Sequence, residues 1–341
     1  MHILFFLDGS WEKMRIRSTE NVIGELHVLH NKYGVNLVIP EDDLFTVQQN
    51  RIVELCNAIG DEFRDKIKFE FPNGLSVATL SDNVIEALMR LNVDVVTIAI
   101  ESGSDRVQRE VIKKNCKLDK AVKVVNAFRE RGPLVRTFFI LGFPGESRAE
   151  MTETLKFAYD LPADWCNIGI AAPLIGTEMY DQLLERGDID QSFNWDQAFF
   201  QERAFDTTEI SAAELKNLVG FANLKINFFG NYNFRFGEID RAISLFKDVI
   251  TSYPGHLAGT YCIALSHQKK GDIDQYEIWK QKCIDILRSK NTGMGIRHLR
   301  TIPDEFPEDF FTEIGEAKPE ERTIRSFWEP ELTTGQDSFF F

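Results

Sequence analysis

Carboxylates, small residues and tight turns follow the predicted strands in the first half of the chain. The five candidate strands are short apolar segments at Val35–Ile39, Ile67–Phe71, Asp94–Ile100, Val135–Leu141 and Cys166–Ala172. The polar and small residues that follow the first, third and fourth of them are Asp42, Asp43, Glu101, Ser102, Gly103, Gly142, Pro144 and Gly145. Because the carboxyl ends of parallel strands meet at one edge, where α/β folds bind ligands, this pattern predicts a ligand site there.

The elements that must position these residues form repeated strand–helix units. Near-continuous apolar strands, separated by enough chain for one helix, are typical of a parallel sheet buried on both faces. Thr46–Gln49, Ser147–Glu150 and Ser211–Glu214 each have the pattern of a capping box at a helix start, and another helix is expected around Glu20–Tyr33. Such repeated units form a barrel, a partial barrel or a doubly wound sheet, and the pattern alone leaves these open.

The second half of the chain is predicted to be helical from about Asp206. A segment that begins at Gly237 recurs at Gly271, which is the 34-residue period of tetratricopeptide repeats. We expect antiparallel helix pairs, and the residues predicted to pack between them are Ala242, Phe246, Ala264 and Ile284. Two repeats are fewer than the roughly three that independent stability needs, so this segment should depend on the rest of the chain.

The end of the chain has a different composition. Residues 303–341 hold 11 acidic residues against three basic ones, together with four prolines, which suits an extended, solvated tail. Its many aromatic residues predict that it packs against the body of the protein. We therefore expect three parts: an α/β domain at 1–204, a helical repeat domain at 205–290 and an acidic, aromatic-containing tail at 291–341.

Composition limits the classes of function. The 341 residues are 43% hydrophobic and 27% charged, as in globular proteins, and the net charge is −14. This charge repels phosphate backbones and disfavours nucleic acid and anionic membranes as partners. No stretch is long and apolar enough to span a bilayer, and an odd number of scattered cysteines predicts reduced thiols in the cytoplasm. A small-molecule substrate is the expected ligand, and the helical repeats suggest a protein partner.

Five segments, in this order, carry a family resemblance. They are EDDLFTVQQNRIVELC (41–56), PNGL (72–75), IESGSDRVQREVIKK (100–114), FFILGFPGE (138–146) and PLIGTEMY (173–180). Together they resemble the radical S-adenosylmethionine (SAM) superfamily, and most closely its branch with an upstream cobalamin-binding domain. The resemblance covers about half of the chain. It implies a partial parallel (β/α) TIM-like barrel lacking its first strand, which an all-α helical repeat segment follows.

The resemblance also implies cofactors and an activity. Such enzymes hold a [4Fe–4S] cluster on three cysteines of a Cys-x-x-x-Cys-x-x-Cys loop after the first strand. The cluster binds the methionine part of SAM and cleaves SAM to a 5′-deoxyadenosyl radical, or supports methyl transfer. Cobalamin would be bound by an upstream domain. The substrate is not implied, because substrate contacts usually come from variable loops.

Individual residues take roles by this resemblance. Glu101 would accept hydrogen bonds from the ribose hydroxyls with both carboxylate oxygens, and Ser102 and Gly103 would shape the turn. The loop from Gly142 through Pro144 to Gly145 would bring backbone groups close to adenine, since glycine admits close approach. Asp42 and Asp43 would face the cavity near the cluster. Lys113 or Lys114 would meet the SAM carboxylate, unless the pair forms a solvated helix face.

The sequence departs from the family at two places. The cluster cysteines are absent, and the register of Trp11–Ser18 places the missing loop at or before Phe5 and Phe6. We therefore expect the first strand and the cluster loop to be truncated, which leaves no metal ligands in this chain. Ser76 and Ala78 stand where relatives often carry Arg and Asp, so the contacts to the substrate are also altered.

Two other interpretations stay open. The chain could be a non-catalytic, decayed barrel whose repeat domain acts as a protein-interaction module. It could also be an ordinary α/β enzyme that uses Asp42, Asp43 and Glu101 as acid–base groups or Mg²⁺ ligands. The latter is weaker, because no nucleophile–base pair accompanies these carboxylates.

The cysteine pattern generates a first prediction. The 341-residue chain, reconstituted with iron and sulfide under argon, should hold no stoichiometric [4Fe–4S] cluster, because its cysteines lack the local loop that orders three thiolates. Iron analysis and visible absorbance measure this directly. A cluster spectrum with about four irons per chain would show the prediction to be wrong.

Overall fold

The structure is a computed structural model that describes residues 16–42, 45–114, 116–190, 206, 208–290 and 292–319. The chain divides into two compact units, Met1–Val219 and Gly220–Phe341. The boundaries predicted at 204/205 and 290/291 stay predictions. None of the helices in the described ranges is long and apolar enough to cross a membrane.

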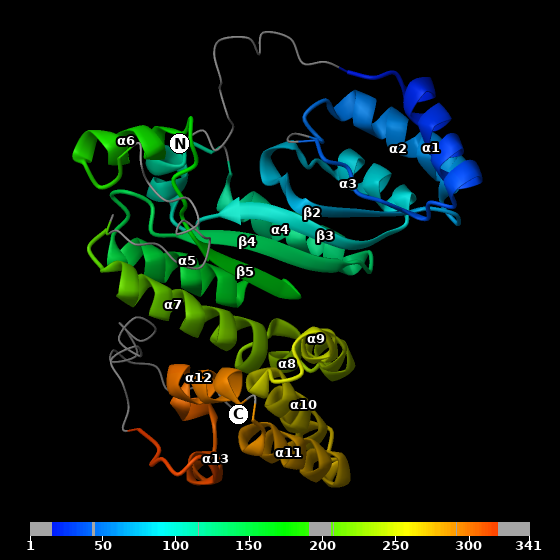
Figure 1. The fold of residues 1–341 in the computed structure, drawn as a ribbon. Helices are drawn as coiled ribbons and strands as arrows, with labels where there is room; N and C mark the ends of the chain where they lie inside the picture. Colours follow the sequence, from blue (N-terminus) through cyan, green and yellow to red (C-terminus); the bar gives the residue numbers. More distant parts are fainter. Residues whose placement is uncertain are drawn as a thin grey trace. The chain divides into compact units, whose positions relative to one another are not determined.

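The first unit is built on one sheet whose five strands are parallel and follow the chain order (Figure 1). The strands are β1 (Leu37–Val38), β2 (Lys68–Ser76), β3 (Val93–Glu101), β4 (Leu134–Leu141) and β5 (Trp165–Ile170). Each coincides with a predicted apolar segment, which confirms the α/β class. The predicted loss of a strand before β1 concerns residues 1–15, which lie outside the described part of the chain.

Helices precede, connect and follow these strands. They are α1 (Thr19–Tyr33), α2 (Gln49–Phe63), α3 (Asp82–Leu88), α4 (Leu118–Glu130), α5 (Arg148–Asp160) and α6 (Glu178–Arg186). Short 3₁₀ turns at Val77–Thr79 and Met89–Leu91 and a π-helical segment at Val107–Val111 complete the connections. α7 (Ala212–Leu224) spans the boundary between the two units. The strand–helix repetition brings all carboxyl ends of the strands to one edge.

One face of the central strands is more deeply buried than the other. In β3, Val96, Ile98 and Ile100 share one face and are fully buried, whereas Val95 and Ala99 on the opposite face are only half-buried. In β4, residues alternate: Phe139 is buried against Phe157 of α5, whereas Phe138 on the opposite face is only half-buried. The expectation that the strands are buried on both faces is therefore wrong for β4, because the described helices cover one of its faces more fully than the other.

Two of the three predicted capping boxes are confirmed. The hydroxyl of Ser147 accepts from the Glu150 N–H and the Glu150 carboxylate accepts from the Ser147 N–H, and the same exchange joins Ser211 to Glu214. The box predicted at Thr46 is wrong, because α2 begins after Gln48 without a side-chain cap. Thr46 is buried, and its hydroxyl bonds to that of Thr79 instead.

The second unit is helical. After a π-helical turn at Lys225–Phe229 it contains α8 (Tyr232–Arg235), α9 (Ile239–Ser252), α10 (Leu257–Lys269), α11 (Ile273–Arg288), α12 (Gly293–Thr301), a 3₁₀ turn at Pro303–Glu305 and α13 (Glu308–Glu313). α10 packs against both α9 and α11. Ala242, Phe246 and Ala264 are fully buried as predicted, but Ile284 is only half-buried, because Cys283 and Leu287 form the buried face of α11. The tetratricopeptide assignment stays a prediction.

The start of the predicted tail is folded. α12 is helical, and so is α13, which lies in the range 303–341 where composition favours extended chain; the Phe306, Phe310 and Phe311 side chains are buried. The Phe306 ring lies 5.3 Å from that of Phe229 and 5.7 Å from that of Tyr261. Burial of these aromatic rings outweighs the acidic composition up to residue 319.

Gly103 lets the turn after β3 lie directly on α5. A Cβ atom at this position would lie 2.6 Å from the Phe157 Cβ and 2.8 Å from the Thr154 Cα. The Gly103 N–H donates to the Thr154 hydroxyl at 3.0 Å, and this hydroxyl also bonds to that of Ser102 at 3.0 Å. A side chain here would displace a helix backbone, so the residue serves close packing in addition to the turn.

Replacing Gly103 with alanine should therefore lower the free energy of unfolding by about 1–3 kcal/mol. The matched control is Gly24→Ala in α1, where nothing lies within 4 Å of the added methyl group. The control should gain about 0.5–1 kcal/mol from helix propensity. Denaturant unfolding measures both; equal effects of the two substitutions would contradict the packing at Gly103.

Two buried histidines cap the start of α10. The Nδ1 atom of His256 accepts from the Gly259 N–H at 3.0 Å, and that of His298 accepts from the Ala258 N–H at 3.3 Å. Their ring centroids lie 4.3 Å apart. Burial lowers the pKa of His256 to about 4 and, together with the nearby His256, that of His298 to about 3.

These pKa values predict loss of stability in mild acid. Below pH 6.5 the unfolded chain takes up protons that the folded chain excludes until pH falls to about 4, so the free energy of unfolding falls as pH falls across this range. Denaturant unfolding at several pH values measures the slope. His256→Asn keeps an oxygen acceptor that does not titrate here and should flatten the slope; an unchanged slope would show that His256 is not its source.

Candidate functional site

Glu101 is the last residue of β3, at the carboxyl edge of the sheet. It is 8% exposed, although it is a carboxylate. Its φ angle is 73°, in the left-handed region that residues with a side chain seldom adopt, and the register with β4 shifts between Ala99 and Glu101. Such a conformation costs about 1–3 kcal/mol and persists only where surrounding contacts hold it, often at functional sites.

Lys114 contacts this carboxylate. The Lys114 Nζ donates to Glu101 Oε1 and to the Ala99 carbonyl, both at 2.9 Å. The expectation that both Glu101 oxygens are free is therefore wrong for Oε1. The chain returns to the strand end after the π-helical segment Val107–Val111, and this return explains the contact. Both side chains are partly buried, so solvent screens the attraction between their charges poorly.

Lys113 points to a different partner. Its Nζ donates to the Glu178 carboxylate at 2.6 and 2.8 Å, and both side chains are exposed. Only Lys114 of the two predicted lysines therefore contacts Glu101.

The loop after β4 is held by hydrogen bonds from its backbone to the Glu146 side chain. Gly142 and Gly145 have positive φ angles of 86° and 77°. The Glu146 Oε2 accepts from the N–H groups of Gly142 and Phe143 at 2.6 and 3.1 Å. Pro144 has no N–H, so contact with adenine would have to involve other groups of this loop. The predicted role of Gly142, Pro144 and Gly145 stays a prediction.

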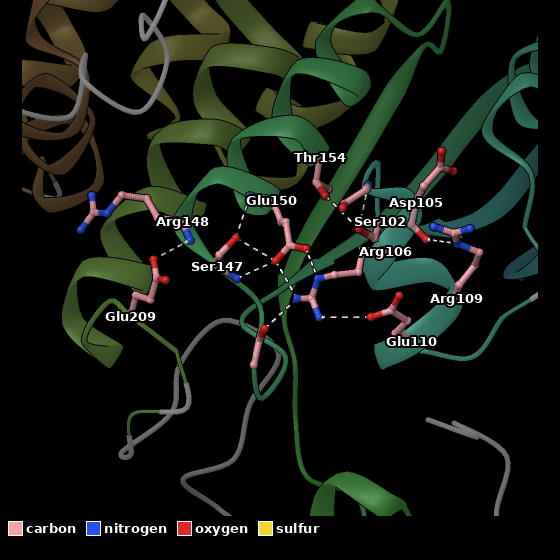
Figure 2. Close-up of polar contacts among 12 residues, drawn as sticks. Ser102, Asp105, Arg106, Arg109, Glu110, Ser147, Arg148, Glu150, Thr154 and Glu209 are labelled. Carbon is pink, nitrogen blue, oxygen red and sulfur yellow. Dashed lines mark hydrogen bonds and ion pairs between the residues drawn. The ribbon is translucent and has the colours of Figure 1, made fainter.

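Arg106 ties this loop to the segment after β3, as Figure 2 shows. Its Nη2 donates to Glu150 Oε2 and to the Gly145 carbonyl, both at 2.8 Å, and its Nε donates to Glu150 Oε1. The hydrogen bond from Arg106 lowers the pKa of Glu150 to about 2. The sequence identified Glu150 as a helix cap, but no local pattern connects it with Arg106.

The carboxylates that follow β1 are not held in the site as Glu101 is. Asp42 is exposed, and Asp43 lies outside the described residues. Glu41, which precedes them, accepts from the Asn73 side chain at 2.8 Å. Since a lysine already neutralises Glu101, this arrangement does not favour the Mg²⁺ site considered from the sequence.

The cysteines do not form a cluster site. All five are buried, and burial raises the pKa of Cys56 to about 12 and that of Cys116 to about 11. Within the described ranges, no three metal-ligating side chains come together. A [4Fe–4S] cluster needs thiolates from a shared loop, so these residues do not fit it.

Comparison with known proteins supports the resemblance. The curated relatives include an uncharacterized methyltransferase of Pyrococcus horikoshii, 30% identical over 54% of this chain and 39% of its own. The cytidylyl-2-hydroxyethylphosphonate methyltransferase of Streptomyces wedmorensis is 28% identical over 52% of this chain and 34% of its own. The chain thus spans well under half of the length of these relatives.

A solved structure also aligns with this chain. The radical SAM methyltransferase TsrM of Kitasatospora setae is 16% identical, with a TM-score of 0.45 over 50% of this chain and 32% of its own. The sequence profile of the radical SAM superfamily matches residues 5–158, a range that contains β1 to β4, Glu101 and the loop after β4. Over this domain, the chain is similar to the radical SAM superfamily.

Proposed function

We propose that the first unit binds the nucleoside of SAM and is the SAM-binding region of a radical SAM enzyme that acts on a small-molecule substrate. The observation that carries this proposal is the carboxylate of Glu101, buried at the carboxyl end of β3 and fixed in a left-handed backbone conformation. Each carboxylate oxygen has two lone-pair positions, so Oε2 and the position that Lys114 leaves on Oε1 can accept from the two hydroxyls of a cis-diol, the arrangement that ribose offers.

The neighbouring charge is consistent with this role. Lys114 donates to Glu101 Oε1 at 2.9 Å and orients the carboxylate at the strand end. Ionised acceptors form stronger hydrogen bonds than neutral ones. The lysine also places a positive charge near the site, where the resemblance expects the carboxylate of SAM.

The proposal for the reaction that follows nucleoside binding depends on the similarity to the radical SAM family. Radical SAM enzymes use a [4Fe–4S] cluster, and the five cysteines of this chain do not fit it, so we derive no step through the cluster. Methyl transfer is the reaction class in the names of both curated relatives, and cobalamin is bound in the solved neighbour. We propose methyl transfer or radical cleavage as the reaction class, with a cytoplasmic location.

A non-catalytic role is the competing proposal. The dispersed, buried cysteines favour it, because no shared loop brings three thiolates together. In that case the helical second unit would act through a protein partner. Binding of 5′-deoxyadenosine without cleavage of SAM would support this second role.

Glu101→Ala should weaken the binding of 5′-deoxyadenosine at least tenfold, because hydrogen bonds to a charged group contribute about 1.5–3 kcal/mol each. Calorimetric titration of the 341-residue chain measures this without a cluster. The unsubstituted chain should bind 2′,5′-dideoxyadenosine, which lacks one ribose hydroxyl, more weakly than 5′-deoxyadenosine. The Glu101→Ala chain should bind the two nucleosides equally.

The matched control is Glu178→Ala, which removes another glutamate that accepts from a lysine. It should bind 5′-deoxyadenosine like the parent chain. Unchanged affinity in Glu101→Ala, with the fold intact by circular dichroism, would remove Glu101 from the site and refute the proposal.

A further inference from the structure

The left-handed conformation of Glu101 requires a group that holds it. A strand that continued straight through Glu101 would have extended φ angles, but φ at this residue is 73°. Lys114 contacts the Glu101 side chain and the Ala99 carbonyl, which lies before the turn. These contacts orient the carboxylate but do not fix the backbone on both sides of it.

Gln108 supplies that contact. Its side chain is 1% exposed, and its Nε2 donates to the Ile100 carbonyl at 2.5 Å and to the Ser102 carbonyl at 2.7 Å. These carbonyls belong to the residues immediately before and after Glu101. A single amide nitrogen thus bridges the residue with the unusual conformation.

The two distances exclude an extended backbone at Glu101. Two oxygens bound to one nitrogen cannot lie farther apart than the sum of their distances from it. This sum is shorter than the roughly 6.6 Å that separates equivalent atoms two residues apart in a strand. The chain must therefore turn between the Ile100 and Ser102 carbonyls, across Glu101, as long as Gln108 makes both hydrogen bonds.

The backbone of Gln108 links the same residue to Lys114. The Gln108 N–H donates to the Ser104 carbonyl, and the Gln108 carbonyl accepts from the Lys114 N–H, both at 2.9 Å. These bonds lie at the start and the end of the π-helical segment Val107–Val111. Gln108 thus contacts both the backbone that carries the carboxylate and the segment that carries its lysine.

We infer that Gln108 is a positioning residue for nucleoside binding. Its side-chain amide fixes the left-handed backbone at Glu101, and its main chain fixes Lys114, so that the carboxylate is presented to the ligand in one orientation. This inference rests on the proposed function of Glu101. An amide is required, since an oxygen in place of Nε2 would face two carbonyl oxygens and could not donate.

The first test needs no ligand. Gln108→Met keeps the approximate volume but removes the donor, and amide hydrogen exchange of the full chain is followed by mass spectrometry. Exchange in the peptide that covers residues 101–104 should accelerate at least tenfold, while exchange in β4 stays unchanged. The control is Val125→Ala in α4, a fully buried residue whose loss should not change exchange at residues 101–104 selectively.

The second test is a double-mutant cycle on the affinity for 5′-deoxyadenosine. Gln108→Met should weaken binding about tenfold when Glu101 is present and have no further effect in the Glu101→Ala chain. Val125→Ala should leave the affinity unchanged. Equal weakening in both backgrounds would show a general structural role and overturn the inference.

The two tests separate this inference from the proposed function. If the parent chain does not bind 5′-deoxyadenosine, the proposed function fails, and the exchange experiment alone decides whether Gln108 holds the turn. If exchange at residues 101–104 is unchanged in Gln108→Met, the inference is wrong even when Glu101 binds the nucleoside.

Discussion

A carboxylate in a left-handed backbone conformation at the end of a buried strand is the constraint on which the candidate site depends. A charged group at such a position needs a counter-charge, and a residue with a side chain in this conformation needs contacts that hold it. Lys114 meets the first need and Gln108 the second. Both come from the segment after β3, so the site is assembled from one strand and its following loop.

The loop after β4 is joined to the segment after β3 through contacts that do not involve Glu101 itself. Gly103 lies against α5 at a distance that no side chain permits, and Arg106 joins the segment to Glu150 and to the Gly145 carbonyl. The turn after β3 and the loop after β4 therefore share α5 as a common support. A change in the packing of α5 would move both, which ties the geometry of the site to the stability of the first unit.

Sequence patterns predicted what depends on local order along the chain. The strand Val135–Leu141 and the helix Glu20–Tyr33 were placed within one residue of β4 and α1, because strong hydrophobic periodicity specifies them. The Thr46 cap failed, since a hydroxyl from a distant turn competes for the same side chain. Periodicity carries no information on such contacts.

In the candidate site, too, the sequence predicts local features but not contacts between distant residues. The position of Glu101 at a strand end follows from the apolar run before it. Its pairing with Lys114 rather than Lys113 does not, because the π-helical segment decides which lysine returns to the strand. The bridge from Gln108 also lies beyond local patterns, since a glutamine in a helix is ordinarily a solvated residue.

Burial has opposite consequences for the two parts of the family's chemistry. Low solvent access strengthens the pairing of Glu101 with Lys114 and favours recognition of a ribose diol by a fixed acceptor. Two residues beyond this lysine, the same low access raises the pKa of the Cys116 thiol to about 11, against the thiolate form that iron requires. Nucleoside recognition and cluster binding therefore make different demands on their surroundings. The segment after β3 meets the first demand, and ligands for a cluster would have to be thiolates held together on a single loop.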